Sequence, residues 1–221
     1  MKATVVILWF MHVIHSPRLT WIVVIASFLW LGVLGYAFYN YAYYLFGAAL
    51  NAFFPIYVVT LVLSVVILIV SLPRMDMAIL VASFRARTPT RLIGGYLAFV
   101  GIGLASVWLI MWAAYIFAGK PTPVEPEAFK VVAAIDISII VTLLVFGGLL
   151  LWRRNAWGYV IAAIASILST LYLIVLSVNS FLAIQRGTAD APGEIPVWGT
   201  LALLTAIATL LLLSNVRSER V

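Results

Sequence analysis

Six apolar stretches of the chain are each long enough to cross a lipid bilayer, and this feature constrains the fold more than any other. They cover residues 19–39, 53–72, 92–118, 131–152, 157–183 and 197–214. A transmembrane helix needs about 20 apolar residues, and a helix satisfies its own backbone hydrogen bonds inside lipid. We therefore expect an all-α integral membrane protein whose six transmembrane helices form a bundle.

The composition leaves almost no room for a water-soluble domain. Of the 221 residues, 66% are hydrophobic and 9% are charged, whereas about a quarter of the residues of a soluble domain are charged. We predict an N-terminal interfacial segment at residues 1–18, a transmembrane domain at residues 19–214 and a cytoplasmic tail at residues 215–221. The chain has no cysteine, which excludes disulfide exchange, cysteine-ligated iron–sulfur clusters and a cysteine nucleophile.

The positive charges are sorted by membrane side. Of the 13 lysine and arginine residues, all but three share a side with the N-terminus: Lys2, Arg18, Arg74, Arg85, Arg87, Arg91, Arg153, Arg154, Arg217 and Arg220. The three on the opposite side are Lys120, Lys130 and Arg186. Because cationic loops resist translocation, we expect both termini in the cytoplasm. Topology thus explains the pI near 9.8, and no nucleic-acid partner is expected.

Five of these arginines are also candidates for contact with lipid head groups. They are Arg85, Arg87, Arg91, Arg153 and Arg154. A cation that faces anionic lipid contributes about 1 kcal/mol of surface attraction, so membrane lipids are expected partners. The plainer interpretation is that these residues only determine topology.

The apolar residues 3–14 form a stretch too short to cross the membrane. We expect a helix that lies in the cytoplasmic interface, and a docking segment for a partner is the alternative. A signal peptide is disfavoured, because Lys2 is the only cation before the apolar stretch and no A-x-A-like site follows it. The spacing of His12 and His15 suits half of a metal site. Since no carboxylate or thiol is nearby, we expect interfacial histidines, no metal and no cofactor.

Asp136 is the only acidic residue inside a predicted span, about 10 Å from its outer end at 1.5 Å per residue. An unpaired carboxyl at that depth costs several kcal/mol. The topology places these polar and aromatic residues at a comparable depth: Tyr36, Trp112, Tyr115, Ser177, Asn179 and Ser180.

We predict an outer-leaflet pocket for a small or lipidic ligand, which the protein binds or passes across the membrane. Its candidate residues are Asp136, Tyr36, Trp112, Tyr115 and Asn179. The alternative is that Asp136 bonds a neighbouring hydroxyl or Lys130 and only fixes helix packing. The proline-rich loop 120–127 either caps the pocket or simply connects two helices.

Two further patterns concern packing. The aromatic run at residues 36–44 predicts an interfacial belt at the outer end of the first span, with a cavity lining as the alternative. Small residues follow a helical spacing of four and three on the third and fifth spans, which we predict to be the inner packing helices. These residues are Gly94, Ala98, Gly101 and Ala105, and Gly158, Ala162, Ala165 and Ser169.

Motifs of intramembrane enzymes are missing from the sequence. It has no pair of membrane aspartates, no H-E-x-x-H and no aspartate pair for magnesium, so we expect no catalytic activity. It also has no internal repeat and no proline deep inside a span, features that many secondary transporters use. The competing interpretation is a structural accessory subunit, associated with other membrane subunits or with copies of itself.

Asp136 is followed by an aliphatic helix and by the pattern W-R-R-x-x-W-G-Y at residues 152–159. This arrangement resembles a family of uncharacterised prokaryotic small multi-span membrane proteins, and the resemblance covers mainly the second to fifth spans. It implies a six-span organisation in a prokaryotic plasma membrane and implies no activity. Members of that family often have proline where this chain has Thr142 and Ala156, so the chain departs from the pattern there.

Overall fold

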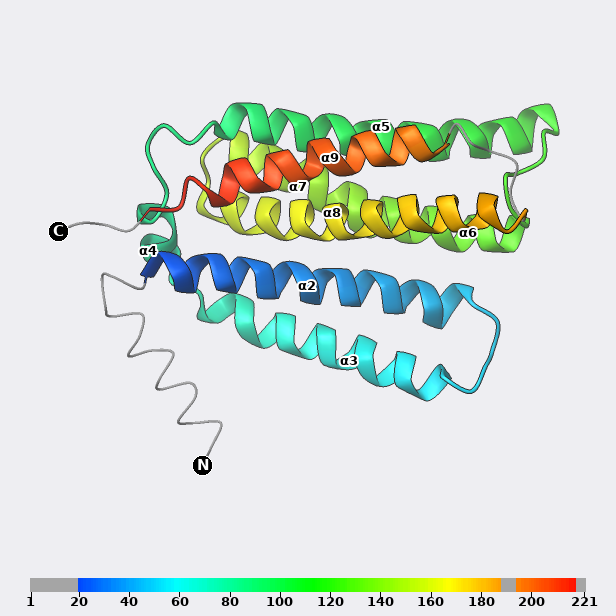
Figure 1. Cartoon of the computed structure of the whole chain (residues 1–221), viewed down its shortest axis with the longest axis horizontal. Coiled ribbons are helices and arrows are strands. Elements are labelled where there is room, and N and C mark those ends of the chain that lie inside the picture. Colours follow the sequence, from blue (N-terminus) through cyan, green and yellow to red (C-terminus); the bar gives the residue numbers. More distant parts are fainter. Residues whose placement is uncertain (1–19, 188–193, 218–221) are drawn as a thin grey trace.

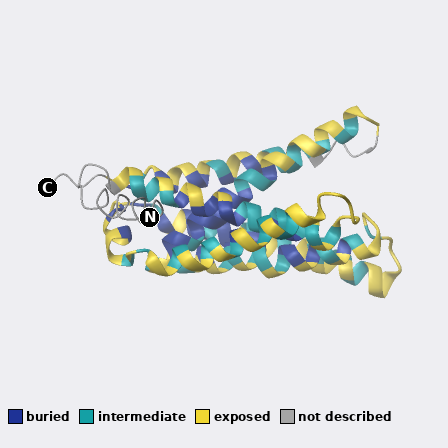
Figure 2. Ribbon diagram, turned by 90° about the horizontal axis from the view of Figure 1, so that it is seen from below, coloured by how far each residue is buried: buried dark blue, intermediate teal, exposed yellow. Residues whose placement is uncertain are grey.

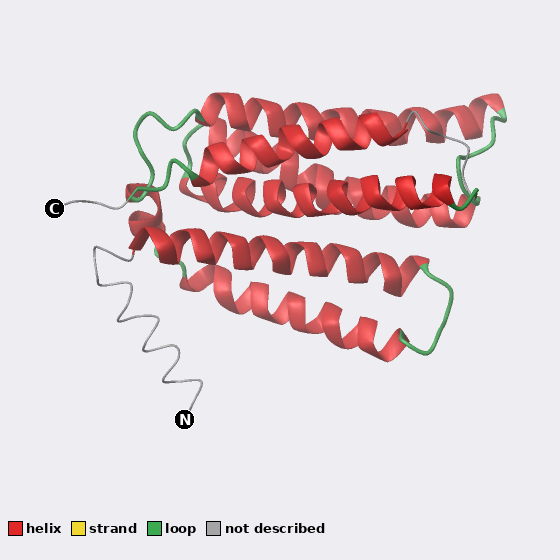
Figure 3. Cartoon of the chain, in the orientation of Figure 1, coloured by secondary structure: helices red, strands yellow, loops and turns green. Residues whose placement is uncertain are grey.

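The computed structural model describes residues 20–187 and 194–217. Over these residues the chain forms six apolar helical spans, each long enough to cross a membrane (Figures 1 and 3). The predicted all-α, six-span fold is therefore confirmed, and the protein is a multi-span membrane protein. The predicted interfacial segment 1–18, with His12 and His15, and residues 218–221 lie outside the described residues.

The spans are assembled from regular helices with two local departures from α geometry. In chain order the elements are α2 (Thr20–Gly47), α3 (Phe54–Ser71) with the 3-10 turn η1 (Leu72–Arg74), α4 (Met77–Ala82), α5 (Thr90–Ala118), α6 (Pro126–Ile135), the π-helical segment η2 (Asp136–Val141), α7 (Thr142–Trp152), α8 (Ala156–Gln185) and α9 (Glu194–Leu213). The helices α6, η2 and α7 together make the fourth span, and α4 is a short connector.

Local signals set the helix ends. Pro126 occupies the first turn of α6, where its missing N–H costs nothing. The side chain of Asn155 caps α8 by accepting a hydrogen bond from the backbone N–H of Trp157 at 2.9 Å. Gly119 ends α5 in the left-handed conformation, at φ 60°. The first span runs to Gly47, well past its expected end at residue 39, because no helix-breaking residue lies between.

The spans form a layered bundle (Figure 1). Helix α7 lies between α5 and α8, and α8 also packs against α2 and α9. Helix α3 packs mainly on α2 at the edge of the molecule. The short helix α4 lies at the end of the bundle where α2 begins and α9 ends, which we call the inner end; the opposite end is the outer end.

Both small-residue stripes allow close approach to the same helix, α7. A Cβ added to Gly94 would lie 2.4 Å from the carbonyl oxygen of Gly148, and one added to Gly158 would lie 2.3 Å from the backbone of Leu150. The prediction that the third span is an inner helix is wrong, since 17% of its apolar window is buried against 50% for α8. Only the face of α5 that carries the small residues is buried, and residues on its other faces, such as Phe99, are exposed.

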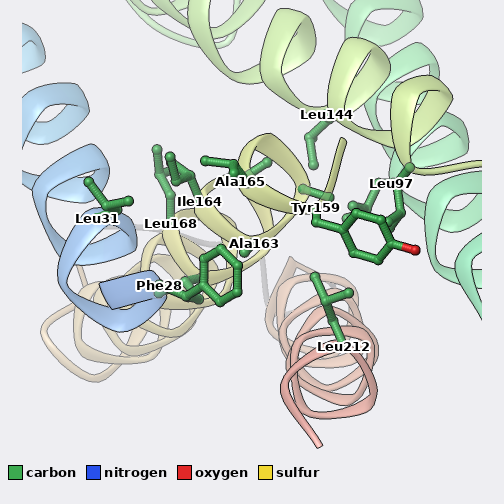
Figure 4. Close-up of a cluster of buried hydrophobic side chains, with 14 of the residues drawn as sticks. Phe28, Leu31, Leu97, Leu144, Tyr159, Ala163, Ile164, Ala165, Leu168 and Leu212 are labelled. Carbon is green, nitrogen blue, oxygen red and sulfur yellow. The ribbon is translucent and has the colours of Figure 1, made fainter. Parts of the chain in front are cut away.

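The hydrophobic core lies in the inner half of the bundle (Figure 2). Figure 4 shows its centre, where α8 supplies Tyr159, Ala163, Ile164, Ala165 and Leu168. Phe28 and Leu31 of α2, Leu97 of α5, Leu144 of α7 and Leu212 of α9 surround them. Nearly every α8 residue from Gly158 to Ser169 is buried, whereas none from Ile174 to Gln185 is. The helix is therefore central in one half of the membrane and peripheral in the other.

The inner end is closed by backbone contacts between α4 and the segment after α9. The N–H of Arg85 donates to the carbonyl of Asn215 at 3.0 Å, and the N–H of Arg217 donates to the carbonyl of Ser83 at 2.7 Å. Phe84 and Val216, which lie between these bonds, are both buried. The first residues after α9 thus belong to the folded bundle.

Candidate functional site

Asp136 lies at a point where three spans meet, and its side chain is 3% exposed. The Tyr39 hydroxyl of α2 donates a hydrogen bond to its Oδ1 at 2.5 Å. The Trp108 indole N–H of α5 donates to its Oδ2 at 2.9 Å. Both carboxyl oxygens are therefore occupied, and the carboxyl links three helices.

Aromatic rings enclose these hydrogen bonds. The ring of Tyr172 on α8 meets that of Tyr39 edge-on, with centroids 5.0 Å apart at 77°, and the two hydroxyls interact electrostatically. The ring of Phe129 meets that of Trp108 at 5.2 Å and 69°. We call Asp136, Tyr39, Trp108, Tyr172 and Phe129 the Asp136 junction.

The junction is deeper than the sequence indicated. Asp136 follows the 10 residues of α6, which places it about 15 Å from the start of its span. Tyr39 lies about two turns before the end of α2. The aromatic run at residues 36–44 is therefore not wholly an interfacial belt, since Tyr39 is buried. Its other members Tyr41 and Tyr44 pack against Tyr57, toward the outer end.

The π-helical segment η2 begins at Asp136. Such segments are rare and are frequent at functional sites, because their extra residue shifts the phase of the helix. Here the shift lets Phe129 and Ala133 be buried before it and Leu144 and Leu151 be buried after it. No proline lies in η2; the Thr142 hydroxyl donates to the carbonyl of Ile137 at 3.3 Å. The departure from α geometry thus directly precedes Thr142.

The predicted pocket residues are only partly near the junction. Tyr36 lies one turn inward of Tyr39, is half-buried and packs against the core. Trp112 and Tyr115 are 49% and 42% exposed, and Asn179 is exposed too. No hydrogen bond joins any of these four side chains to Asp136 in the part of the chain that the structure describes. Lys130 does not pair with Asp136 either, because its ammonium contacts Glu127 at 2.5 Å.

The exposed candidates nevertheless share helix faces with the junction. Trp112 and Tyr115 follow Trp108 by four and seven residues, and Asn179 follows Tyr172 by seven. These spacings repeat one face of an α-helix. The faces of α5 and α8 that reach the junction therefore continue toward the outer end with exposed aromatic and amide groups.

Sequence reasoning missed Trp108 and Tyr172, and it took Tyr39 for an interfacial residue. A signal for two of them was present, because each small-residue stripe continues at the same spacing. Three residues beyond Ala105 is Trp108, and three residues beyond Ser169 is Tyr172.

The candidate lipid-contacting arginines lie at the inner end. Arg85, Arg87, Arg91 and Arg153 are exposed there. The guanidinium of Arg154 instead donates a hydrogen bond to the carbonyl of Ala86 at 2.9 Å, and its backbone is left-handed at φ 55°. Arg154 therefore holds the turn between α7 and α8 to the segment before α5.

No group of three residues suited to hold a metal ion occurs within residues 20–187 and 194–217. Comparisons with protein-family models, with curated proteins and with solved structures gave no match. The chain is thus assigned to the class of multi-span helical membrane proteins by its own six spans.

Proposed function

We propose that this protein is a non-catalytic membrane protein that binds a small or lipidic ligand at an outward-facing site above the Asp136 junction, or passes it across the membrane. The proposal rests on one observation: the faces of α5 and α8 that reach the junction continue toward the outer end. Trp112, Tyr115 and Asn179 lie on those faces and are exposed. Exposed aromatic and amide groups above a buried carboxyl offer contacts to a ligand and are not used in helix packing.

The arrangement of the helices supports such a site. Above the junction, α8 and α9 diverge from the other helices (Figure 2). The burial of α8 changes at the same level, since Leu173 is its last buried residue and directly follows Tyr172 of the junction. The junction thus lies where the packed inner half ends, and the proposed ligand contacts lie outward of it.

The chemistry of the side chains suits an amphipathic ligand. Tryptophan and tyrosine each offer an apolar ring and one polar tip, and Asn179 adds an amide that both donates and accepts. The one acidic side chain, Asp136, is enclosed and already bonded. Aromatic and amide groups therefore make the first contacts, with the carboxyl beneath them.

The same proposal includes the orientation of the protein and the membrane in which it lies. Seven arginines of the described chain lie at the inner end: Arg74, Arg85, Arg87, Arg91, Arg153, Arg154 and Arg217. Their grouping supports cytoplasmic termini, with the exposed arginines of the inner end near lipid head groups. The resemblance to the uncharacterised prokaryotic family supports a plasma membrane of that origin.

The test is the mass spectrometry of small molecules extracted from the purified protein. We expect the wild-type protein to retain a ligand, and we expect Trp112→Ala and Asn179→Ala to retain less of it. The matched control is Ile110→Ala, because Ile110 is 66% exposed on the opposite face of α5, two residues from Trp108. Asp136→Asn, which keeps the shape of the side chain, should fold and change the retained ligand. A wild-type sample without ligand, or equal loss in Ile110→Ala, contradicts the proposal.

A second candidate function, a structural accessory subunit, is favoured by α3. Only 6% of its apolar window is buried, and it packs mainly on α2. Such an edge helix suits a partner subunit or a second copy of the chain. Purification in mild detergent tests this candidate, because an accessory subunit should elute with a stoichiometric partner and a ligand-binding protein should not require one.

A further inference from the structure

The surroundings of Asp136 restrict which ion its carboxyl can bind. Three neighbouring helices contribute Tyr39 from α2, Trp108 from α5 and Tyr172 from α8. Two more tyrosines of α2, Tyr36 and Tyr43, interact electrostatically with Tyr172. None of these groups is a cation. On its own span, Lys130 is exposed and paired with Glu127.

The carboxyl is held by hydrogen-bond donors and not by further acceptors. A metal cation needs several oxygen ligands that offer lone pairs. The Trp108 N–H has no lone pair to offer, and it points at Oδ2 from 2.9 Å. A metal ion at Asp136 would therefore have to displace the indole. A proton needs no such coordination shell.

We infer that Asp136 is a proton-binding site, at which the carboxyl takes up and releases one proton through the hydrogen bond with Tyr39. This inference deepens the proposed function. A coupling between proton binding and ligand binding at Asp136 rests on that proposed function. Among the residues that the structure describes, the carboxyl is buried without a neighbouring cation, which supports the inference because an uncompensated charge is costly in this environment.

The hydrogen bonds determine which oxygen takes the proton. A carboxylate only accepts, whereas a carboxylic acid also donates one hydrogen bond. An O–H on Oδ2 would face the Trp108 N–H, which cannot accept. An O–H on Oδ1 can donate to the Tyr39 oxygen, provided that the Tyr39 proton turns toward another acceptor. The hydroxyl of Tyr172 interacts with that of Tyr39 and can be this acceptor.

The direction of proton exchange follows from the packing around the junction. Toward the inner end, α8 is buried from Gly158 to Ser169. Toward the outer end, Tyr172 interacts with Tyr43, whose ring lies 5.7 Å from that of the exposed Tyr44. Hydroxyl-bearing rings thus lie between Asp136 and the outer end, and the inference includes proton exchange with that side.

Infrared difference spectroscopy of the full-length protein in lipid tests the inference without a reagent that must reach the buried group. A protonated carboxyl has a C=O stretching band well separated from that of a carboxylate. We expect the wild-type protein to show such a band in acidic buffer and to lose it in alkaline buffer. The other carboxyl side chains also absorb there when protonated, so the band of Asp136 is the component that Asp136→Asn removes. Tyr39→Phe should shift the frequency of that component because the phenyl ring neither donates nor accepts.

Several controls keep the outcome decisive. Ile110→Ala changes an exposed side chain on the opposite face of α5 and should keep the wild-type band. Asp136→Glu should retain a titrating carboxyl even if Asp136→Asn folds poorly. A band that is the same at every pH, or a pH response identical in wild type and Asp136→Asn, overturns the inference. Ligand retention measured in parallel separates the two proposals: a titrating Asp136 without ligand defeats only the proposed function, and a retained ligand with a non-titrating Asp136 defeats only the proton site.

Discussion

Gly94 and Gly148 face each other so closely that neither can carry a side chain. A Cβ on Gly94 would lie 2.4 Å from the carbonyl oxygen of Gly148, and a Cβ on Gly148 would lie 2.5 Å from the carbonyl oxygen of Gly94. The contact fixes α5 against α7 in the inner half of the bundle. Because Trp108 continues the same face of α5, this contact also sets the approach of its indole to Asp136.

Replacing Gly94 with alanine should therefore destabilise the protein. Overpacking costs about 1–3 kcal/mol, which outweighs the gain of up to about 1 kcal/mol from removing a helical glycine. The measurement is the thermal unfolding midpoint in detergent. Gly103 is the matched control on the same helix, since a Cβ there meets nothing within 4 Å. Gly103→Ala should leave the midpoint unchanged or raise it, and equal midpoints for the two variants would contradict the packing argument.

The hydrogen bond from Tyr39 to Asp136 should contribute measurably to stability. Tyr39→Phe keeps the ring and leaves Oδ1 without its donor, which costs about 1–3 kcal/mol for a buried group. The unfolding midpoint should fall, and it should fall less when Asp136 is already leucine, which has no oxygen to accept the hydrogen bond. Tyr115→Phe serves as the control, because Tyr115 is exposed. Additive effects of Tyr39→Phe and Asp136→Leu would show that the two side chains are not coupled.

The sequence was sufficient to predict the six spans because apolar length alone determines them. It also indicated Asp136, since a lone carboxyl inside a span stands out. The partners of Asp136 were harder to identify, because Tyr39 and Trp108 are separated from it by 97 and 28 residues. Their selection depends on how α2, α5 and α6 are rotated about their axes, which apolar spans do not specify.

The small-residue stripes carried part of that missing information. The stripes mark the faces of α5 and α8 that approach α7. Trp108 and Tyr172 lie on the same two faces, three residues beyond the last small residue of each stripe. The divergence of the helices above the junction had no comparable signal, since exposed and buried membrane helices share one apolar composition. For that reason the sequence did not indicate that Trp112, Tyr115 and Asn179 are exposed.

The orientation of the bundle predicts the accessibility of new cysteines. The chain has no native cysteine, so labelling has no background. Cysteine at the exposed Glu125, in the loop between α5 and α6, should react with an impermeant thiol reagent on intact cells. Cysteine at the exposed Arg87, at the inner end, should react only after the cells are opened. The reverse pattern would place Asp136 nearer the cytoplasmic face.

The π-helical segment predicts an unusual effect of removing one residue. Deleting Ser138 should restore regular α geometry and rotate the residues before it by about 100° relative to α7. Asp136 and Phe129 would then leave Tyr39 and Trp108, so the unfolding midpoint should fall at least as far as in Tyr39→Phe. The point substitution Ser138→Ala is the matched control, because Ser138 is exposed and its hydroxyl bonds only the carbonyl of Ala134 within its own helix. If the deletion and the substitution have equal midpoints, the extra residue of η2 does not position Asp136.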